Sequence, residues 1–326
     1  MKLGILGSGM IVQDFLPEID NLNIDYKAIL GTERSRERVE NLAAQYKIDK
    51  IYFDYDEMLT DENLDTIYIA LPNNLHYQFA KKALIANKNV IIEKPCVTNY
   101  EELKDLKQIA TERGKMIFEA MTVHYLPAYL SIRADLQKLG DIKIVSMNYS
   151  QYSSRYDKFK QGEILPAFDP KKAGGALMDL NVYNLHFIVG LFGKPQNFSY
   201  SANIERGIDT SGVLVLDYGK FKAVCIGAKD CQVITVSTIQ GDKGNIIMEI
   251  PINRIDAYII NYNNGEGSVE SFDEDKHRML YEFETFIEII DNKDFEHAEK
   301  FLQVTEIVAQ ILQEARAQVG IKFSED

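Results

Sequence analysis

The sequence predicts an α/β protein with a doubly wound parallel sheet near its N-terminus and an open, mostly antiparallel sheet in its second half. In residues 1–122, short runs rich in Val and Ile alternate with helical patterns, which is typical of parallel strands joined by crossover helices. In residues 123–326, alternating runs are separated by turn sequences, for example at 218–220 and 241–244, which indicates antiparallel hairpins. At 326 residues the chain is long enough for two domains, which we place at 1–122 and 123–326.

The composition is that of an ordinary soluble globular protein, with 46% hydrophobic and 26% charged residues. Lys and Arg number 36 against 49 Asp and Glu, and the net charge of −13 argues against nucleic acid or an anionic membrane as a partner. Cys96, Cys225 and Cys231 have no disulfide or metal-ligand spacing, so we expect no metal site and a reducing, cytoplasmic location. We expect no signal peptide before the first strand, and we expect no apolar run long enough to span a bilayer.

The N-terminal elements follow from the spacing of the hydrophobic residues. Short runs of branched apolar residues predict buried parallel strands, and apolar residues at helical spacing predict amphipathic helices. The predicted strands span residues 2–6, 26–30, 51–53, 66–70, 90–92 and 116–121, and the predicted helices span 35–46 and 75–86. Open sheets of this kind bind their ligands at the carboxyl ends of the strands, so the segments after these strands are the candidate site.

A glycine-rich turn follows the first predicted strand. It reads Gly7-Ser8-Gly9-Met10-Ile11-Val12, which is most of a GxGxxG motif, and it opens a helical pattern. Gly7 would permit the tight turn, and Gly9 would let a pyrophosphate approach the backbone. The third glycine is replaced by Val12, which implies looser packing of the helix on the strand. We expect a dinucleotide here, contacted by Gly7, Ser8, Gly9, Met10 and Ile11.

The end of the second predicted strand bears on the choice between NAD and NADP. An acid at this place holds the 2′-hydroxyl of NAD, whereas an arginine accommodates the 2′-phosphate of NADP, and this chain has both in Glu33 and Arg34. Arg34, Glu37 and Arg38 can equally form a solvated helix face with ordinary i,i+4 pairing. We favour NADP, read by Arg34, with NAD as the alternative.

The segment after the strand at 66–70 carries polar side chains at the same edge of the predicted sheet. We expect it to lie near the nicotinamide, with contacts from Leu71, Pro72, Asn73 and His76. The alternative for His76 is a first-turn helix residue whose ring is satisfied by nearby protein groups.

The strand at 90–92 ends abruptly on Glu93-Lys94-Pro95. Proline cannot extend a β-ladder, so the strand stops there, and a carboxylate and an ammonium fall at its carboxyl end. From these residues alone, the alternative to a functional site is that Lys94 and Pro95 simply end the strand.

The second half contains alternating runs and several helical patterns. Strands are predicted at 142–149, 198–203, 212–217, 221–227, 233–239, 246–250 and 255–262, and helices at 127–139, 174–191, 278–290 and 297–317. We expect the last two helices to be covering elements. In the helix at 174–191, Asp179, Tyr183 and His186 fall at i, i+4 and i+7, which places them on one face. That face is either catalytic or simply the solvated side of the helix.

Four segments occur in an order that resembles the Gfo/Idh/MocA oxidoreductases, the family of glucose–fructose oxidoreductase and inositol dehydrogenase. They are Gly7-Ser8-Gly9, the segment at 70–76, Glu93-Lys94-Pro95 and the segment at 174–183. The resemblance covers essentially the whole chain. It implies an N-terminal Rossmann domain and a C-terminal α/β domain with an open sheet. It also implies NAD(P)-dependent hydride transfer on a sugar, polyol or cyclic diol.

Within the family, the segment at 118–121 and Tyr183 are most similar to the branch of dihydrodiol dehydrogenase, xylose dehydrogenase and glucose–fructose oxidoreductase. That branch often continues with an aromatic residue and an arginine, where this chain has Val123 and His124. The resemblance places His124 near the nicotinamide; a plain domain-boundary residue is the alternative. It also implies a homo-oligomer, a dimer or a tetramer, and allows a cis bond between Lys94 and Pro95.

Hydride transfer at a secondary alcohol moves a proton at nearly the same time, so an acid–base group is required. Tyr183 is the candidate, because a phenol, with a pKa of about 10, needs a nearby cation to work at neutral pH, and Lys94 would supply it. Either residue can be the direct proton carrier. Asp179 would orient the substrate or Lys94, and His186 would bind a hydroxyl. Arg155 is a candidate polyol ligand, with a mobile polar loop as the alternative.

We therefore expect an NAD(P)-dependent dehydrogenase or reductase of a small molecule with CH–OH groups. Two alternatives are a non-catalytic dinucleotide-sensing regulatory protein and a redox-neutral NAD-dependent glycosidase. Lys94 and Tyr183 together favour the enzyme, because a sensor has no need for an acid–base pair.

Overall fold

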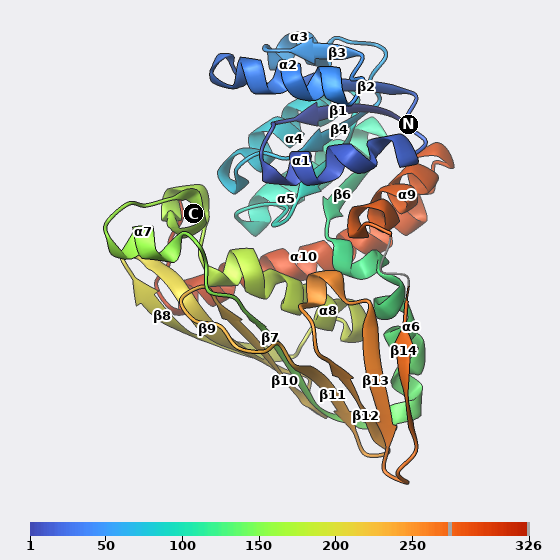
Figure 1. The fold of residues 1–326 in the computed structure, drawn as a ribbon, viewed down its shortest axis with the longest axis vertical. Coiled ribbons are helices and arrows are strands. Elements are labelled where there is room, and N and C mark those ends of the chain that lie inside the picture. Colours follow the sequence, from blue (N-terminus) through green and yellow to red (C-terminus); the bar gives the residue numbers. More distant parts are fainter. Residues whose placement is uncertain (273–275, 325–326) are drawn as a thin grey trace. The chain divides into compact units, whose positions relative to one another are not determined.

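The chain packs into two compact units in the computed structural model, which describes residues 1–272 and 276–324 (Figure 1). The first unit contains Met1–Ala120 and Met279–Gln303, and the second contains Met121–Arg278 and Val304–Asp326. Helix α10 (Phe295–Gln318) therefore contributes residues to both units. The division into domains at 1–122 and 123–326 stays a prediction.

The first unit is built on a six-stranded parallel sheet with the strand order β3-β2-β1-β4-β5-β6, which confirms the predicted N-terminal fold. Its strands are β1 (Lys2–Leu6), β2 (Tyr26–Leu30), β3 (Lys50–Tyr52), β4 (Thr66–Ile69), β5 (Asn89–Glu93) and β6 (Ile117–Ala120). Its α-helices are α1 (Met10–Phe15), α2 (Arg36–Gln45), α3 (Tyr55–Leu59), α4 (His76–Ile85), α5 (Tyr100–Arg113) and α9 (Arg278–Asp291), and short 3-10 helices span Leu16–Asn21, Glu33–Ser35 and Asn73–Leu75.

The register of this sheet aligns the carboxyl ends of its central strands. Leu6 of β1 lies between Leu30 of β2 and Ile69 of β4, and Ile69 is paired with Ile92 of β5. The loops that follow these four residues therefore leave the sheet side by side at one edge. This is the edge at which parallel sheets bind their ligands.

An aromatic cluster joins helix α9 to the rest of the first unit. The Phe283 ring stacks on Phe15 of α1 at 4.2 Å between centroids and meets Tyr68 of β4 edge-on at 5.1 Å. Phe286 lies 4.8 Å from Phe118 of β6. These rings are fully or almost fully buried, so α9 is a covering helix, as expected.

The second unit is built on an eight-stranded sheet with the order β14-β13-β12-β11-β7-β10-β9-β8. Among the described strands of this second sheet, only β7 and β10 pair in parallel, so the predicted mostly antiparallel sheet is confirmed. The strands are β7 (Ile142–Ser150), β8 (Asn197–Glu205), β9 (Ile208–Asp217), β10 (Lys222–Ala228), β11 (Ser237–Gly241), β12 (Gly244–Met248), β13 (Ala257–Tyr262) and β14 (Gly267–Ser271).

The helices of the second unit include one π-helix, Leu177–Asn181, that continues directly into α8 (Val182–Phe192). The other α-helices are α6 (Pro127–Asp135) and α7 (Tyr156–Lys160), and short 3-10 helices span Thr122–Tyr125, Leu136–Leu139, Pro166–Phe168, Pro170–Lys172 and Ile252–Arg254. The π-helix lies against β10, because a Cβ atom added to Gly227 would be 2.7 Å from the Cβ of Asn181.

Several elements differ from the sequence predictions, among them the short helices α3 and α7, which were not predicted. The strand expected at 233–239 begins only at Ser237, and Val233, Ile234 and Val236 are exposed. The polar strand β14 and the helix α5 were not predicted, although α5 carries recognisable signals. Asn99 and Glu102 form a capping box at its start, and Gly114 ends it in a left-handed conformation.

One stretch among the described residues, Pro170–Phe192, is long and apolar enough to cross a membrane by length and composition. This differs from the expectation that no apolar run would be long enough to span a bilayer. The structure buries 67% of its most apolar window inside the protein, as core helices are buried.

Candidate functional site

The glycine turn after β1 is open at one glycine and closely packed at the other. Gly7 has φ +105°, and a Cβ there would lie 2.7 Å from the Ala70 carbonyl oxygen, so this position favours glycine. No atom lies within 4 Å of a Cβ added to Gly9, which is exposed at the start of α1. Ser8 is buried, and Met10 is 71% exposed. The turn thus leaves space over its exposed backbone for an extended ligand.

Glu33 and Arg34, after β2, differ in their partners. The Arg36 guanidinium donates to both carboxylate oxygens of Glu33, at 2.6 and 2.9 Å, and stacks 3.7 Å from the centre of the Phe53 ring. Hydrogen bonding from Arg36 lowers the pKa of Glu33. Arg34 is exposed and makes no hydrogen bond or ion pair with any residue that the structure describes. Arg34 is therefore available to bind an anion, whereas the negative charge of Glu33 is already paired with Arg36.

His76 joins the loop after β4 to the turn after β5. Its ring is fully buried, with Nε2 2.8 Å from the Leu71 carbonyl oxygen and Nδ1 2.9 Å from the Pro95 carbonyl oxygen. Burial lowers the pKa of His76, although both carbonyl contacts oppose the shift. The residue expected near the nicotinamide therefore has both ring nitrogens in contact with backbone carbonyl oxygens, and it connects the predicted contacts Leu71, Pro72 and Asn73 to the turn that carries Lys94.

Two further contacts hold the segment Glu93-Lys94-Pro95 at the end of β5. The Tyr68 hydroxyl donates to Glu93 at 2.5 Å, and the buried Glu119 carboxylate of β6 accepts a hydrogen bond of 2.9 Å from the Cys96 amide. The Lys94–Pro95 bond is cis, as the resemblance allowed. Lys94 itself is half-buried. Its backbone is thus fixed on both sides within the first unit.

The predicted site residues of the second unit differ in exposure. The side chain of Asp179 is 36% exposed, and Tyr183 is half-buried with its ring 5.9 Å from that of Tyr149. His186 is fully buried, and its Nδ1 lies 3.0 Å from Nε2 of His124. Because Asp179 lies in the π-helix and the other two in α8, the regular α-helical spacing assumed from sequence does not apply across all three.

His124 lies in the 3-10 helix Thr122–Tyr125, and Arg155 lies just before α7. The His124 ring meets Tyr129 edge-on at 5.6 Å, and burial, followed by the charge of His186, lowers its pKa well below the usual value. Arg155 is half-buried, and its amide donates to the Ser153 hydroxyl at 3.3 Å. The structure thus brings His124 and His186 together and places Arg155 on a separate loop.

The sequence and the fold are similar to those of known proteins. Residues 1–121 match the Gfo/Idh/MocA family model, described as an oxidoreductase family with an NAD-binding Rossmann fold. The chain is 32% identical over 327 residues to scyllo-inositol 2-dehydrogenase (NADP(+)) IolU of Bacillus subtilis (strain 168), covering 100% of this chain and 99% of the relative.

The chain belongs to the Gfo/Idh/MocA family. It is accordingly an NAD(P)-dependent oxidoreductase. Another family relative, trans-1,2-dihydrobenzene-1,2-diol dehydrogenase of Sus scrofa, is 26% identical over 350 residues and covers 100% of this chain and 99% of its own. The fold is similar to KijD10, a 3-ketoreductase from Actinomadura kijaniata solved with NADP and TDP-benzene, with a TM-score of 0.84, 19% identity, and coverage of 98% and 97% of the two chains.

Lys229, which pairs with Asp179, was not among the site residues predicted from the sequence. Lys229 Nζ lies 2.7 Å from Asp179 Oδ2, although the residue is only 2% exposed. The two are far apart in the sequence, and a lysine in a polar segment reads as a solvated residue, so no sequence signal identified the pair.

Asp209 was also missed, and it holds the start of the π-helix. Its buried carboxylate accepts hydrogen bonds from the Leu177 amide at 2.6 Å and from the Tyr200 hydroxyl at 2.7 Å. Burial raises the pKa of Asp209 to about 6. The helix that carries Asp179 and Tyr183 thus begins at a buried carboxylate.

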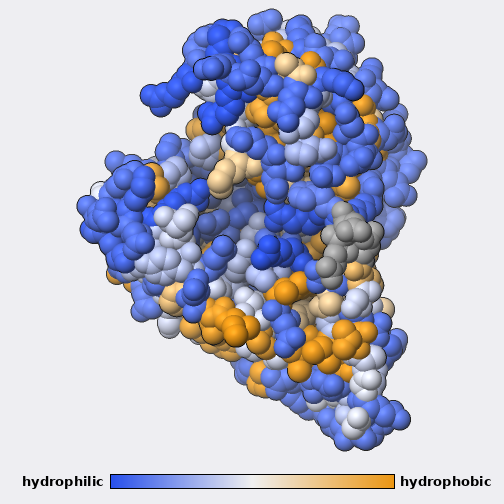
Figure 2. All heavy atoms as spheres, viewed as in Figure 1, coloured by the Kyte–Doolittle hydropathy of each residue, from blue (hydrophilic) through white to orange (hydrophobic). Residues whose placement is uncertain are grey.

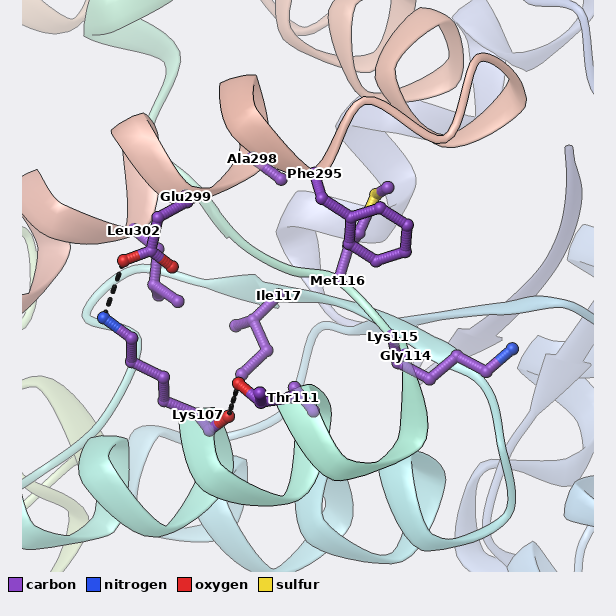
Figure 3. Close-up of a pocket in the computed structure, with 11 residues that line it drawn as sticks. Lys107, Thr111, Gly114, Lys115, Met116, Ile117, Phe295, Ala298, Glu299 and Leu302 are labelled. Carbon is purple, nitrogen blue, oxygen red and sulfur yellow. Dashed lines mark hydrogen bonds and ion pairs between the residues drawn. The ribbon is translucent and has the colours of Figure 1, made fainter.

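A separate pocket of about 280 Å³ lies in the first unit, between α5 and the first turns of α10 (Figure 3). It reaches Met116 and Ile117, at the amino end of β6, so it opens away from the carboxyl edge of the sheet. Lys107 crosses it to form a 2.7 Å ion pair with Glu299. None of the predicted site residues lines this pocket.

We expect Asp209→Asn to change the pH dependence of stability. The unfolded carboxyl titrates near 3.8 and the folded one near 6, so the folded protein binds more protons between these values and stability falls as the pH rises through them. The wild type should lose about 3 kcal/mol of unfolding free energy relative to Asp209→Asn between about pH 4 and about pH 7.

Urea titrations of both proteins across this range measure the difference. Asparagine retains an acceptor for the Leu177 amide, so the variant should stay folded. Parallel pH curves for the two proteins would contradict the prediction.

Proposed function

We propose that the protein is an NADP(H)-dependent dehydrogenase or reductase of cyclic polyols or cyclic diols. The observation that carries this proposal is the place of Lys94, directly after β5 in the same row of strand ends as the glycine turn after β1. Relatives over the full chain are named as a scyllo-inositol dehydrogenase that uses NADP(+) and as dihydrobenzenediol dehydrogenases. Both names describe the oxidation of ring alcohols, which supports the same substrate class here.

The residues at the carboxyl edge fit a dinucleotide. Gly7, Ser8 and Gly9 form a turn with open space over Gly9, and Met10 and Ile11 continue it. The loop of Leu71, Pro72 and Asn73, together with Glu93, follows the neighbouring strands, and His76 positions that loop. His124 is assigned to the same cofactor site as a proposal. When bound, the nicotinamide supplies the carbon that exchanges a hydride with the substrate.

The preference for NADP is assigned to Arg34. Its guanidinium has no partner among the described residues, whereas Glu33 is bound by Arg36 and is poorly placed to accept a ribose hydroxyl. The NADP(+) specificity in the name of the Bacillus subtilis relative supports this choice.

We expect Arg34→Ala to weaken NADPH binding by roughly tenfold or more, because it removes a charge-assisted contact to the 2′-phosphate. NADH lacks that phosphate, so its affinity should stay unchanged. Parallel fluorescence titrations with both nucleotides measure the effect, with Arg38→Ala, an exposed arginine on α2, as the control. An equal loss for NADPH and NADH would contradict the assignment.

Lys94 and Tyr183 are assigned as the acid–base pair. Lys94 donates to the reacting substrate oxygen and stabilises negative charge on it, while the Tyr183 hydroxyl gives or takes the proton. Asp179 and Arg155 orient the other substrate hydroxyls, and His186, which contacts His124, is assigned to bind a hydroxyl as well. The contacts of His76 and Glu119 fix the backbone on which Lys94 is carried, which supports its role as a positioned group.

The decisive experiment is Lys94→Ala, assayed with NADPH or NADP(+) and a panel of inositols and cyclic diols. We expect kcat to fall by roughly 100-fold to 10,000-fold, because one catalytic donor and its charge are removed. NADPH affinity should stay within a few-fold of the wild type. Lys115→Ala, near the pocket at the opposite edge, is the control. Near-normal turnover by Lys94→Ala would overturn the mechanism.

A homo-oligomer is proposed from the sheet of the second unit. Apolar residues on one face of neighbouring strands pair across the sheet, and they are exposed or half-buried; they are Val213 with Ile226, Val215 with Val224, Ile247 with Ile259, and Ile259 with Val269. Hydrophobic side chains also gather over the strands of this unit in Figure 2. Large apolar faces of this kind are typical of protein interfaces.

Sedimentation equilibrium should give a mass of two or four chains. Val213→Asp should shift the protein toward the monomer, because a charge on this face opposes its burial against a second copy. Lys143→Asp, on an exposed polar position of β7, is the control and should leave the mass unchanged. A monomeric wild type would contradict the proposal.

A further inference from the structure

Lys229 is a buried cation at the end of β10. The residue is 2% exposed, yet its ammonium has three neighbours that favour a positive charge. Nζ lies 2.7 Å from Asp179 Oδ2 and 2.7 Å from the Ala167 carbonyl oxygen, and it lies 4.8 Å from the centre of the Phe168 ring. A buried ammonium is costly unless it is paired and hydrogen-bonded, and Lys229 meets both conditions.

The backbone of Lys229 ties together further segments of the second unit. Its amide donates to the Thr210 carbonyl oxygen at 2.8 Å, and its carbonyl accepts from the Ser153 amide at 2.9 Å. The Ser153 loop leads into Arg155, the proposed polyol ligand. Lys229 therefore connects the loop of Arg155, the loop of Ala167 and the π-helix of Asp179.

The partner of Lys229 is more accessible than Lys229 itself. The Asp179 side chain is 36% exposed, whereas the Lys229 side chain is 3% exposed. The ammonium thus approaches the carboxylate from the protein interior and binds its Oδ2 atom. Asp179 also lies in a π-helix, a conformation found often at functional sites.

We propose that Lys229 is a positioning residue that holds Asp179 as an oriented carboxylate, so that Asp179 acts as a hydrogen-bond acceptor for a hydroxyl of the cyclic polyol or diol substrate. The inference rests on the proposed function and gives Asp179 one role in it. An ionised carboxylate only accepts hydrogen bonds, so Asp179 selects a substrate that presents a hydroxyl at this place. Lys229 touches neither substrate nor cofactor in this scheme.

The chain offers a matched control for this ion pair. Lys222, also on β10, binds Asp217 at 2.8 Å and the Gly219 carbonyl oxygen at 3.1 Å, so its partners are of the same kind. Its side chain is 47% exposed. An exposed pair of this type contributes little to stability, and its removal should leave kinetics unchanged.

The test is a double-mutant cycle on kcat/KM with Asp179→Asn, Lys229→Met and the combined variant. We expect each single change to lower kcat/KM by roughly 10- to 100-fold, the range for a hydrogen bond to a charged group. Lys229→Met in the Asp179→Asn background should cost no more than about twofold, because Lys229 acts through the carboxylate. NADPH affinity should be unchanged in all variants, and Lys222→Met should match the wild type.

The combined variant keeps the test valid if Lys229→Met alone fails to fold, because it removes both charges of the pair. A further loss of about tenfold or more in the combined variant, or a loss of NADPH affinity, would show that Lys229 acts independently of Asp179 and would overturn the inference. So would full activity of Lys229→Met. A wild type that is inactive on every ring polyol and diol would instead overturn the proposed function.

Discussion

The parallel register of the first sheet is the constraint on which the candidate cofactor site depends. Pairing of Leu6 with Leu30 and Ile69, and of Ile69 with Ile92, makes four chain segments leave the sheet at one edge. A slip of one residue in any pairing would turn the buried side chains of that strand to the other face, so the hydrophobic core itself fixes this alignment. Chemistry at the edge thus depends on packing in the middle of the strands.

Polar contacts then convert this alignment into a fixed backbone. His76 bridges the carbonyl oxygens of Leu71 and Pro95, and Glu119 of β6 binds the amide of Cys96, so the loops after β4 and β5 and the strand β6 are connected by buried groups. Such groups are costly to bury unless they are hydrogen-bonded, which makes the connected arrangement more favourable than partly connected ones.

In the second unit, buried charged groups fix the backbone in the same way. Asp209 binds the amide at the start of the π-helix, and Lys229 binds a carboxylate two residues further along it, so the helix is held from two strands of the sheet. Gly227 allows the helix to approach β10 closely, since a side chain there would meet Asn181. Close packing against β10 and buried charged groups therefore both hold the π-helix in place.

Much of the fold and part of the candidate site could be predicted from the sequence, because their signals are local. The apolar run of β5 is buried on both faces and ends at a proline, and the glycine turn lies directly after a strand. Val233 and Ile234 have high β propensity, yet pairing of β11 with β7 begins only at Thr238, so tertiary context overrides propensity there.

The features that could not be predicted are pairings between distant parts of the chain. Lys229 and Asp179 are 50 residues apart, and only the folded sheet brings them together. The spacing of Asp179, Tyr183 and His186 suggested one face because it assumed an α-helix throughout, and the π-helix has no recognised signal in these residues.

The distribution of the three thiols has a practical consequence. Cys96 and Cys225 are buried, whereas Cys231 is exposed next to the segment anchored by Lys229. A thiol-reactive dye would therefore attach to the unaltered protein at a single position, beside the end of β10. The natural chain thus carries its own attachment point for an optical reporter of motion near Asp179.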